Sequence, residues 1–226
     1  MALDPVLGCS LDVQSWLDNA LDRFQADNDD LVPETRALLG QIVPDPARHG
    51  RLINTLSMLE HLGSHKIMTT QHSAGIDQPT LKHVAEEAHH AYFMKRQAEK
   101  TAGRPLAYVP GDLLAPAAGR MYFQRLEARL ARALRRAAGT PAVYLYMSMI
   151  IEFRALWFYR LYQQALSSAQ HPMSLKRVLG EEQSHLLDMA ERLDARAELS
   201  AELATAFLGH ERRLYRRLLS ALGAAA

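Results

Sequence analysis

Two helical segments of this 226-residue chain carry the same pattern, which restricts the fold more than any other sequence feature. Residues 86–94 read Glu-Glu-Ala-His-His-Ala-Tyr-Phe-Met, and residues 181–189 read Glu-Glu-Gln-Ser-His-Leu-Leu-Asp-Met. Aligned without gaps, they share both glutamates, the histidine three residues after the second glutamate, and the methionine. Because residues three apart lie on one face of a helix, each Glu-x-x-His pair can present two ligands to one metal ion.

The first segment allows two registers, because Glu86 with His89 and Glu87 with His90 have the same spacing. We expect the second register, since only Glu87 and His90 align with the pair in the other segment. There, the glutamate and histidine of the pair lie on the apolar stripe of their helix.

Two further acids lie on helical stripes that are predicted to be buried. Glu60 shares a stripe with Ile53, Leu56 and Ile67, and Glu152 lies in the most apolar segment of the chain. A buried carboxylate is costly unless it is paired or binds a metal. These acids and the two Glu-x-x-His pairs together predict a site with four carboxylates and two histidines for two metal ions. The expected ligands are Glu60, Glu87, His90, Glu152, Glu182 and His185.

The whole sequence favours helix, because Ala, Leu, Arg, Glu, Gln and Met dominate and β-branched residues are sparse. Four long helices are expected, over 51–69, 79–102, 141–168 and 172–197. Between the second and third, a connection over 103–140 contains a helix near 120–138. That connection is long enough to cross the whole bundle. Shorter helices are expected over 11–26, capped by Ser10, and over 33–40, and a last one over 201–222.

The order Glu, Glu-x-x-His, Glu, Glu-x-x-His resembles the ferritin-like superfamily of di-iron carboxylate proteins, over roughly residues 50–197. The resemblance implies an all-α, ferritin-like four-helix bundle with its long crossover between the second and third helices. We expect one domain over 1–226, with a helical extension at 1–49, the bundle at 50–197 and a final helix in 198–226. The resemblance also implies that Glu86 and Glu181 hydrogen-bond the free nitrogens of the ligand histidines on opposite helices.

The expected function is that of a non-haem di-iron oxidoreductase, with manganese as the alternative metal. Such an enzyme activates dioxygen to hydroxylate, desaturate or N-oxygenate a small organic substrate. Two alternatives stay open: a ferroxidase or iron-handling protein, and a tRNA-modifying di-iron hydroxylase. The last would use arginine clusters in the crossover helix and the final helix, although a net charge of +1 argues against a nucleic-acid partner.

Cysteine content and apolar run lengths bear on the partners and the location. Cys9 is the only cysteine, which excludes iron–sulfur clusters and Cys-based zinc sites within the chain. Electrons would therefore come from a separate donor protein. No apolar run is long enough to span a membrane, and no signal peptide is evident, so a cytoplasmic protein is expected. A homodimer is expected because more amphipathic helices are present than a four-helix core needs.

Several other residues have a simpler interpretation. Tyr144, Tyr159 and Tyr162 share the helix of Glu152 and are taken as core aromatics, with a hydrogen bond to the site or a redox role as the alternative. His83 fits no pattern. Gly63 and Ser64 lie one turn beyond Glu60, where small residues indicate either a pocket beside the metals or a close helix contact.

Overall fold

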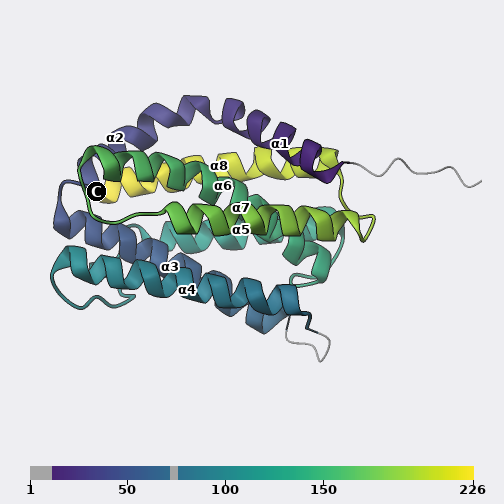
Figure 1. Cartoon of the computed structure of the whole chain (residues 1–226), viewed down its shortest axis with the longest axis horizontal. Helices are drawn as coiled ribbons and strands as arrows, with labels where there is room; N and C mark the ends of the chain where they lie inside the picture. The colour runs from purple at the N-terminus through teal and green to yellow at the C-terminus, as the bar shows by residue number, and fades with distance from the viewer. Residues whose placement is uncertain (1–11, 72–75) are drawn as a thin grey trace, which may run out of the picture.

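The computed structural model describes residues 12–71 and 76–226, and the described residues form helices and no strands (Figure 1). The all-α prediction is confirmed. The expected cap Ser10 lies outside the described residues, and the first described helix is capped by Asp12. The described residues contain eight α-helices: α1 (Val13–Asp27), α2 (Val32–Ile42), α3 (Pro46–Thr70), α4 (Gln78–Ala102), α5 (Pro116–Leu134), α6 (Pro141–Ser168), α7 (Lys176–Asp194) and α8 (Ala201–Ala225).

Proline and left-handed residues set several helix ends. Pro46, Pro116 and Pro141 each occupy the first turn of a helix, where a missing backbone N–H costs nothing. The crossover helix starts and ends about four residues earlier than expected, and Arg135 ends it with a φ of 52°. Helix α7 begins later than Pro172, because the backbone N–H of Leu175 donates to the Gln163 side chain instead of extending a helix.

Helices α3 and α4 form one antiparallel pair, and α6 and α7 form another. Near the start of α3, Gly50 packs so closely on Ala102 at the end of α4 that a Cβ there would lie 2.8 Å from the alanine Cβ. Farther along, the Ser57 hydroxyl donates to the carbonyl of Ala91. The close contact at Gly50 explains why this position of α3 carries no side chain.

The connection between α4 and α6 runs the full length of α3. At its start the Asn54 side chain donates to the carbonyl of Asp112, and at its end Gln71 donates to the carbonyl of Gly139. Helix α6 then runs back along α3, because Tyr159 bonds Glu60 and Tyr162 pairs with His49 nearer the start of α3. Helices α4 and α6 therefore run in the same direction (Figure 1). The connection contains helix α5, as expected, whereas the ferritin-like topology of the bundle and the single domain stay predictions.

Helices α1, α2 and α8 cover the side of α6 that faces away from α3 and α4 (Figure 1). Their core includes a buried ion pair, in which Arg154 of α6 donates through Nε and Nη2 to Glu211 of α8 at 2.9 and 2.8 Å. No helix in the described part of the chain combines the length and apolarity that crossing a bilayer requires.

Candidate metal centre

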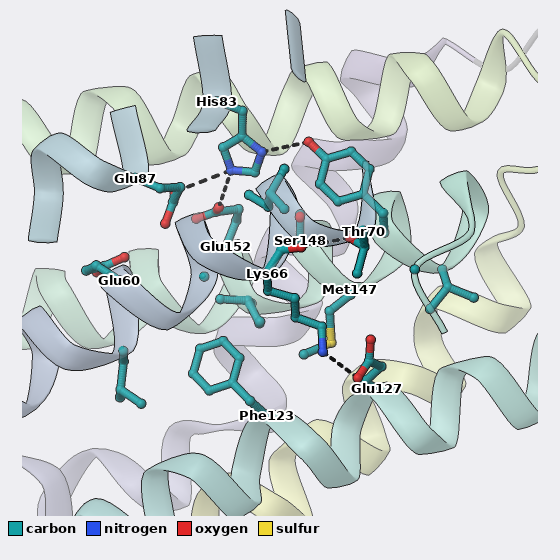
Figure 2. A pocket seen from close by; sticks show the side chains of 17 residues that line it. Glu60, Lys66, Thr70, His83, Glu87, Phe123, Glu127, Met147, Ser148 and Glu152 are labelled. Atoms are coloured by element: carbon teal, nitrogen blue, oxygen red, sulfur yellow. Dashed lines mark hydrogen bonds and ion pairs between the residues drawn. The ribbon is translucent and has the colours of Figure 1, made fainter. Parts of the chain in front are cut away.

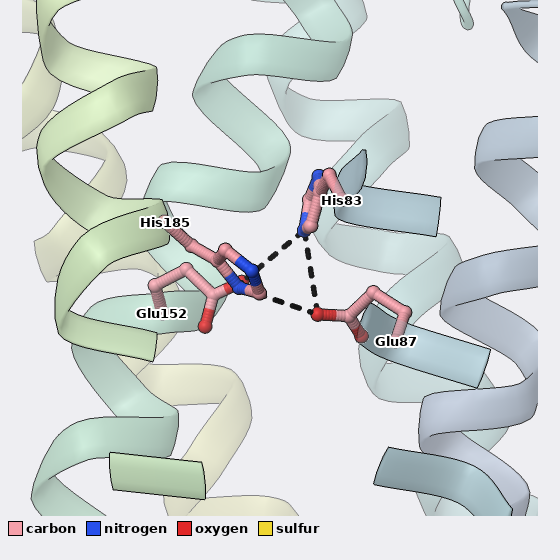
Figure 3. Close-up of side chains that lie close together, drawn as sticks. All are labelled: His83, Glu87, Glu152 and His185. Atoms are coloured by element: carbon pink, nitrogen blue, oxygen red, sulfur yellow. Dashed lines mark ion pairs between the residues drawn. The ribbon is translucent and has the colours of Figure 1, made fainter. Parts of the chain in front are cut away.

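Seven side chains from α3, α4, α6 and α7 form two adjacent clusters that can hold metal ions. The first cluster is His83, Glu87, Glu152 and His185 (Figure 3), and the second is Glu60, Glu87, His90 and Glu182. Within each cluster the candidate ligand atoms all lie within 4.8 Å of one another. Glu87 belongs to both clusters and therefore lies where a carboxylate could bridge two ions.

All six residues expected from the sequence lie in these clusters. Between the two possible registers on α4, the geometry brings in Glu87 and His90, which are buried, while His89 is exposed. Each Glu-x-x-His pair shares one face of its helix, and the antiparallel pairing of α3 with α4 and of α6 with α7 brings Glu60 and Glu152 to the same level. Glu60 is only partly buried.

The first cluster contains a residue that the sequence analysis set aside. His83 precedes Glu87 by four residues, so its ring lies on the same face of α4. Its Nε2 is 3.3 Å from an oxygen of Glu87 and 3.7 Å from an oxygen of Glu152. The signal was the spacing His-x-x-x-Glu-x-x-His, which extends the α4 motif by one turn and has no counterpart on α7.

In each histidine of the clusters, one ring nitrogen points away from the cluster and has a hydrogen-bond partner there; we call it the outer nitrogen. Glu181 lies 2.8 Å from Nε2 of His90, and Glu86 lies 2.9 Å from Nε2 of His185. These are contacts between opposite helices, α7 to α4 and α4 to α7. The hydroxyl of Tyr144 lies 2.8 Å from Nδ1 of His83. Such partners fix the tautomer and orientation of metal-binding histidines.

The other ring nitrogen of each of these histidines, the inner nitrogen, faces the carboxylates of the cluster. Two of them, Nε2 of His83 and Nδ1 of His90, are buried without a hydrogen-bond partner among the described residues. The third, Nδ1 of His185, lies 3.0 Å from Glu182. Buried polar atoms are normally satisfied, so two unpaired ring nitrogens beside four carboxylates fit a site that binds cations.

The clusters are also arranged to stabilise positive charge. Burial opposes protonation of His90, but Glu182, with an oxygen 3.2 Å from Nδ1, outweighs it and raises the pKa of His90 to about 10. Glu152 and Glu182 raise the pKa of His185 to about 12 against the same effect of burial. The pKa of Glu60 is raised well above its usual value, first by burial and then by the charge of Glu87. The carboxylates of the centre thus favour a positive charge beside them, which is the condition for binding a cation.

Two of the three α6 tyrosines contact the centre, which corrects their interpretation as ordinary core aromatics. The Tyr159 hydroxyl donates to Glu60, and burial together with the charge of Glu60 raises the pKa of Tyr159 well above its usual value. Tyr144 contacts His83 as described above. Tyr162 instead pairs with His49, whose Nε2 lies 2.5 Å from its hydroxyl.

Among the described residues, three cavities reach the clusters. One, of about 210 Å³, is lined mainly by polar side chains that include His83, Glu86 and His185. The Lys66 cavity, of about 60 Å³, is lined by His83, Glu87 and Glu152 and also by the ion pair of Lys66 and Glu127 (Figure 2). The Arg154 cavity, of about 110 Å³, lies between α3, α5, α6 and α8 and reaches all four glutamates of the clusters. Gly63 lines the Lys66 cavity, which favours the pocket among the two roles considered for the small residues after Glu60.

Removing the outer partner of a histidine should weaken metal binding without unfolding the chain. Outer partners contribute about 10- to 100-fold to metal affinity, so we expect losses in that range for Glu86→Ala and Glu181→Ala. Competition with a chromophoric zinc chelator measures the affinity. Glu191→Ala, which removes an exposed carboxylate of α7, is the matched control. Equal affinities in all three variants would contradict a supporting role for Glu86 and Glu181.

The chain matches no known family model, and no curated protein or solved structure shows significant similarity to it. What the centre does must therefore follow from its own geometry.

Proposed function

We propose that the protein is a non-haem di-iron oxidoreductase with a ferritin-like fold, which uses dioxygen to oxidise a small organic substrate. The observation that carries this proposal is the pair of clusters that share Glu87. Each of their three histidines has a hydrogen-bond partner on its outer nitrogen and faces carboxylates with its inner nitrogen. Mixed carboxylate and imidazole ligands suit iron, with manganese as the alternative.

Two bound ferrous ions would supply two electrons to dioxygen in one turnover. Hydroxylation of a C–H bond consumes one dioxygen, two electrons and two protons, and it leaves one oxygen atom in the product and one in water. A separate donor protein would return the two electrons, because a chain with one cysteine cannot hold an iron–sulfur cluster.

The chain's own residues have three tasks in this proposal. The four glutamates and three histidines hold the ions, and Glu86, Glu181 and Tyr144 orient the rings. Tyr159 keeps its proton on the hydroxyl that donates to Glu60, so a proton is held beside the second cluster. Apolar side chains line most of the Lys66 and Arg154 cavities and would limit the water beside the ions.

The apolar walls of the Lys66 and Arg154 cavities support an oxygenase over an iron-storage protein, because iron storage has no use for an apolar space beside the ligands. The tRNA-modifying alternative has no comparable support. In the last helix, Arg212 and Arg216 both pair with Asp30, at 2.6 and 2.7 Å.

The test is a single oxygen pulse on protein reconstituted anaerobically with a large excess of ferrous iron. An oxygenase should bind about two irons per chain, consume about one dioxygen per pair of bound irons in a fast phase, and then continue only at the rate of free ferrous iron. The Glu87→Ala/Glu182→Ala double variant should consume oxygen only at the rate of free ferrous iron. Continued oxidation of the excess iron into a mineral core, in a particle of many subunits, would instead establish the storage alternative.

A further inference from the structure

The Arg154 cavity connects the metal-binding clusters with the far side of α6. Its wall includes the cluster glutamates Glu60, Glu87, Glu152 and Glu182. It also includes Tyr215, Leu218 and Leu222 of α8, a helix that contributes nothing to the clusters. The cavity therefore extends from the proposed ions to α8.

Apolar side chains make up most of the wall between these limits: Leu52, Leu56, Phe123, Ile151, Ala155 and Phe158. The hydroxyls that line the cavity already have partners. Those of Thr55, Tyr122 and Tyr159 bond the Leu114 carbonyl, Glu211 and Glu60 respectively, and that of Tyr215 lies 3.4 Å from Thr35. A ligand in this space would therefore meet hydrocarbon along most of its length.

Unlike the hydroxyls of the wall, Arg154 has one hydrogen-bond donor without a partner. Its Nε and Nη2 are bonded to Glu211, and Nη2 also donates to Asn28 at 2.6 Å. The ring of Tyr215 lies 3.9 Å from the guanidinium carbon, and the rings of Phe24 and Trp157 lie 4.8 Å from it. Nη1 is buried and has no hydrogen-bond partner among the described residues.

A buried donor without a partner costs free energy, and an acceptor atom on a ligand would remove that cost. The acceptor should be uncharged, because Glu211 already neutralises Arg154, and a second carboxylate would be an unbalanced buried charge. A cavity holds roughly one water-sized group per 10–15 Å³, so about 110 Å³ accepts a molecule of roughly ten non-hydrogen atoms.

We propose that the substrate of this centre is an elongated, mainly apolar molecule with an uncharged hydrogen-bond acceptor, such as an amide or ketone carbonyl. The carbonyl accepts from Nη1 of Arg154, and the apolar chain extends along α6 toward Glu60 and Glu152. This inference rests on the proposed function for the identity of the site, although ligand binding can be measured apart from oxygen chemistry.

Three probes with the same eight-carbon chain test it: octanamide, octanoate and octylammonium. Each is titrated calorimetrically into iron-reconstituted protein under anaerobic conditions. We expect octanamide to bind once per chain, and the two charged probes to bind at least tenfold more weakly. If octanoate or octylammonium binds as tightly as octanamide, the inference that the acceptor is uncharged is wrong. If octanamide does not bind, the whole proposal is wrong.

Two variants locate the ligand. Ala155→Leu fills the cavity wall and should weaken octanamide binding at least tenfold, whereas Ala165→Leu, a partly buried alanine of the same helix outside this cavity, should not. Arg154→Met/Glu211→Leu removes the donor without leaving a buried charge and should also weaken binding at least tenfold. Unchanged binding in Ala155→Leu would show that octanamide binds elsewhere.

The outcomes separate this inference from the proposed function. Ala155→Leu should still bind two irons per chain, because it changes no cluster residue. If wild-type protein binds two irons and consumes oxygen but does not bind octanamide, only the substrate class fails. If octanamide binds and iron does not, the di-iron function fails.

Discussion

Replacing Glu87 by alanine should abolish stable binding at both metal positions, while replacing Glu60 or Glu152 should abolish it at one. Glu87 is the residue that the two clusters share, whereas Glu60 belongs only to the second and Glu152 only to the first. Loss of a direct ligand should cost at least the 100-fold that marks the upper end for outer partners. Metal analysis of desalted protein should therefore give about two, one, one and zero ions per chain for wild type, Glu60→Ala, Glu152→Ala and Glu87→Ala.

These variants should fold, because each removes one carboxyl group from a set of four that lie close together. Far-ultraviolet circular dichroism of the metal-free proteins checks that point. Two ions retained in Glu87→Ala would contradict the shared position of this glutamate. Loss of both ions in Glu60→Ala and in Glu152→Ala would show that the two positions fill only together.

The largest effect on stability should come from Glu211→Ala. This substitution leaves the guanidinium of Arg154 buried among Phe24, Trp157 and Tyr215 without its counter-ion. Breaking a buried ion pair by removing one partner typically costs about 3–5 kcal/mol. Urea denaturation of the full chain should show a decrease of that size in the free energy of unfolding.

Arg154→Met/Glu211→Leu removes both charges together and should recover most of the loss, since apolar replacement of a whole buried pair is often neutral. Asp30→Ala, which breaks the exposed pairs with Arg212 and Arg216, should change the stability little. A double variant as unstable as Glu211→Ala would mean that the pair itself, and not the unpaired charge, stabilises the fold.

The sequence predicted the main helices and six of the seven positions that form the clusters, because both depend on local periodicity. A Glu-x-x-His pair shares a helix face whatever surrounds it, and a lone acid on an apolar stripe such as Glu152 must find a partner. The same reasoning missed His83, since a single histidine four residues before a glutamate is common on helices. His83 becomes a member of a cluster only because the fold brings Glu152, from a different helix, next to it.

Long-range partners were outside the reach of the sequence for the same reason. Arg154 lies in the most apolar segment, and nothing local shows that Glu211 on α8 will neutralise it. Tyr159 looks like any other core aromatic until α3 places Glu60 against its hydroxyl. The outer partners Glu86 and Glu181 were expected only from the resemblance to di-iron proteins, and the structure places both within hydrogen-bond distance of a histidine on the opposite helix.

The most direct test of the two-metal centre is anomalous diffraction at the iron absorption edge, on crystals of protein reconstituted anaerobically with ferrous iron. Two anomalous peaks are expected in each chain. One should contact His83, Glu87, Glu152 and His185, and the other Glu60, Glu87, His90 and Glu182. A single peak, peaks away from these residues, or no peak in iron-saturated crystals would contradict a di-iron centre and, with it, the proposed oxygen chemistry.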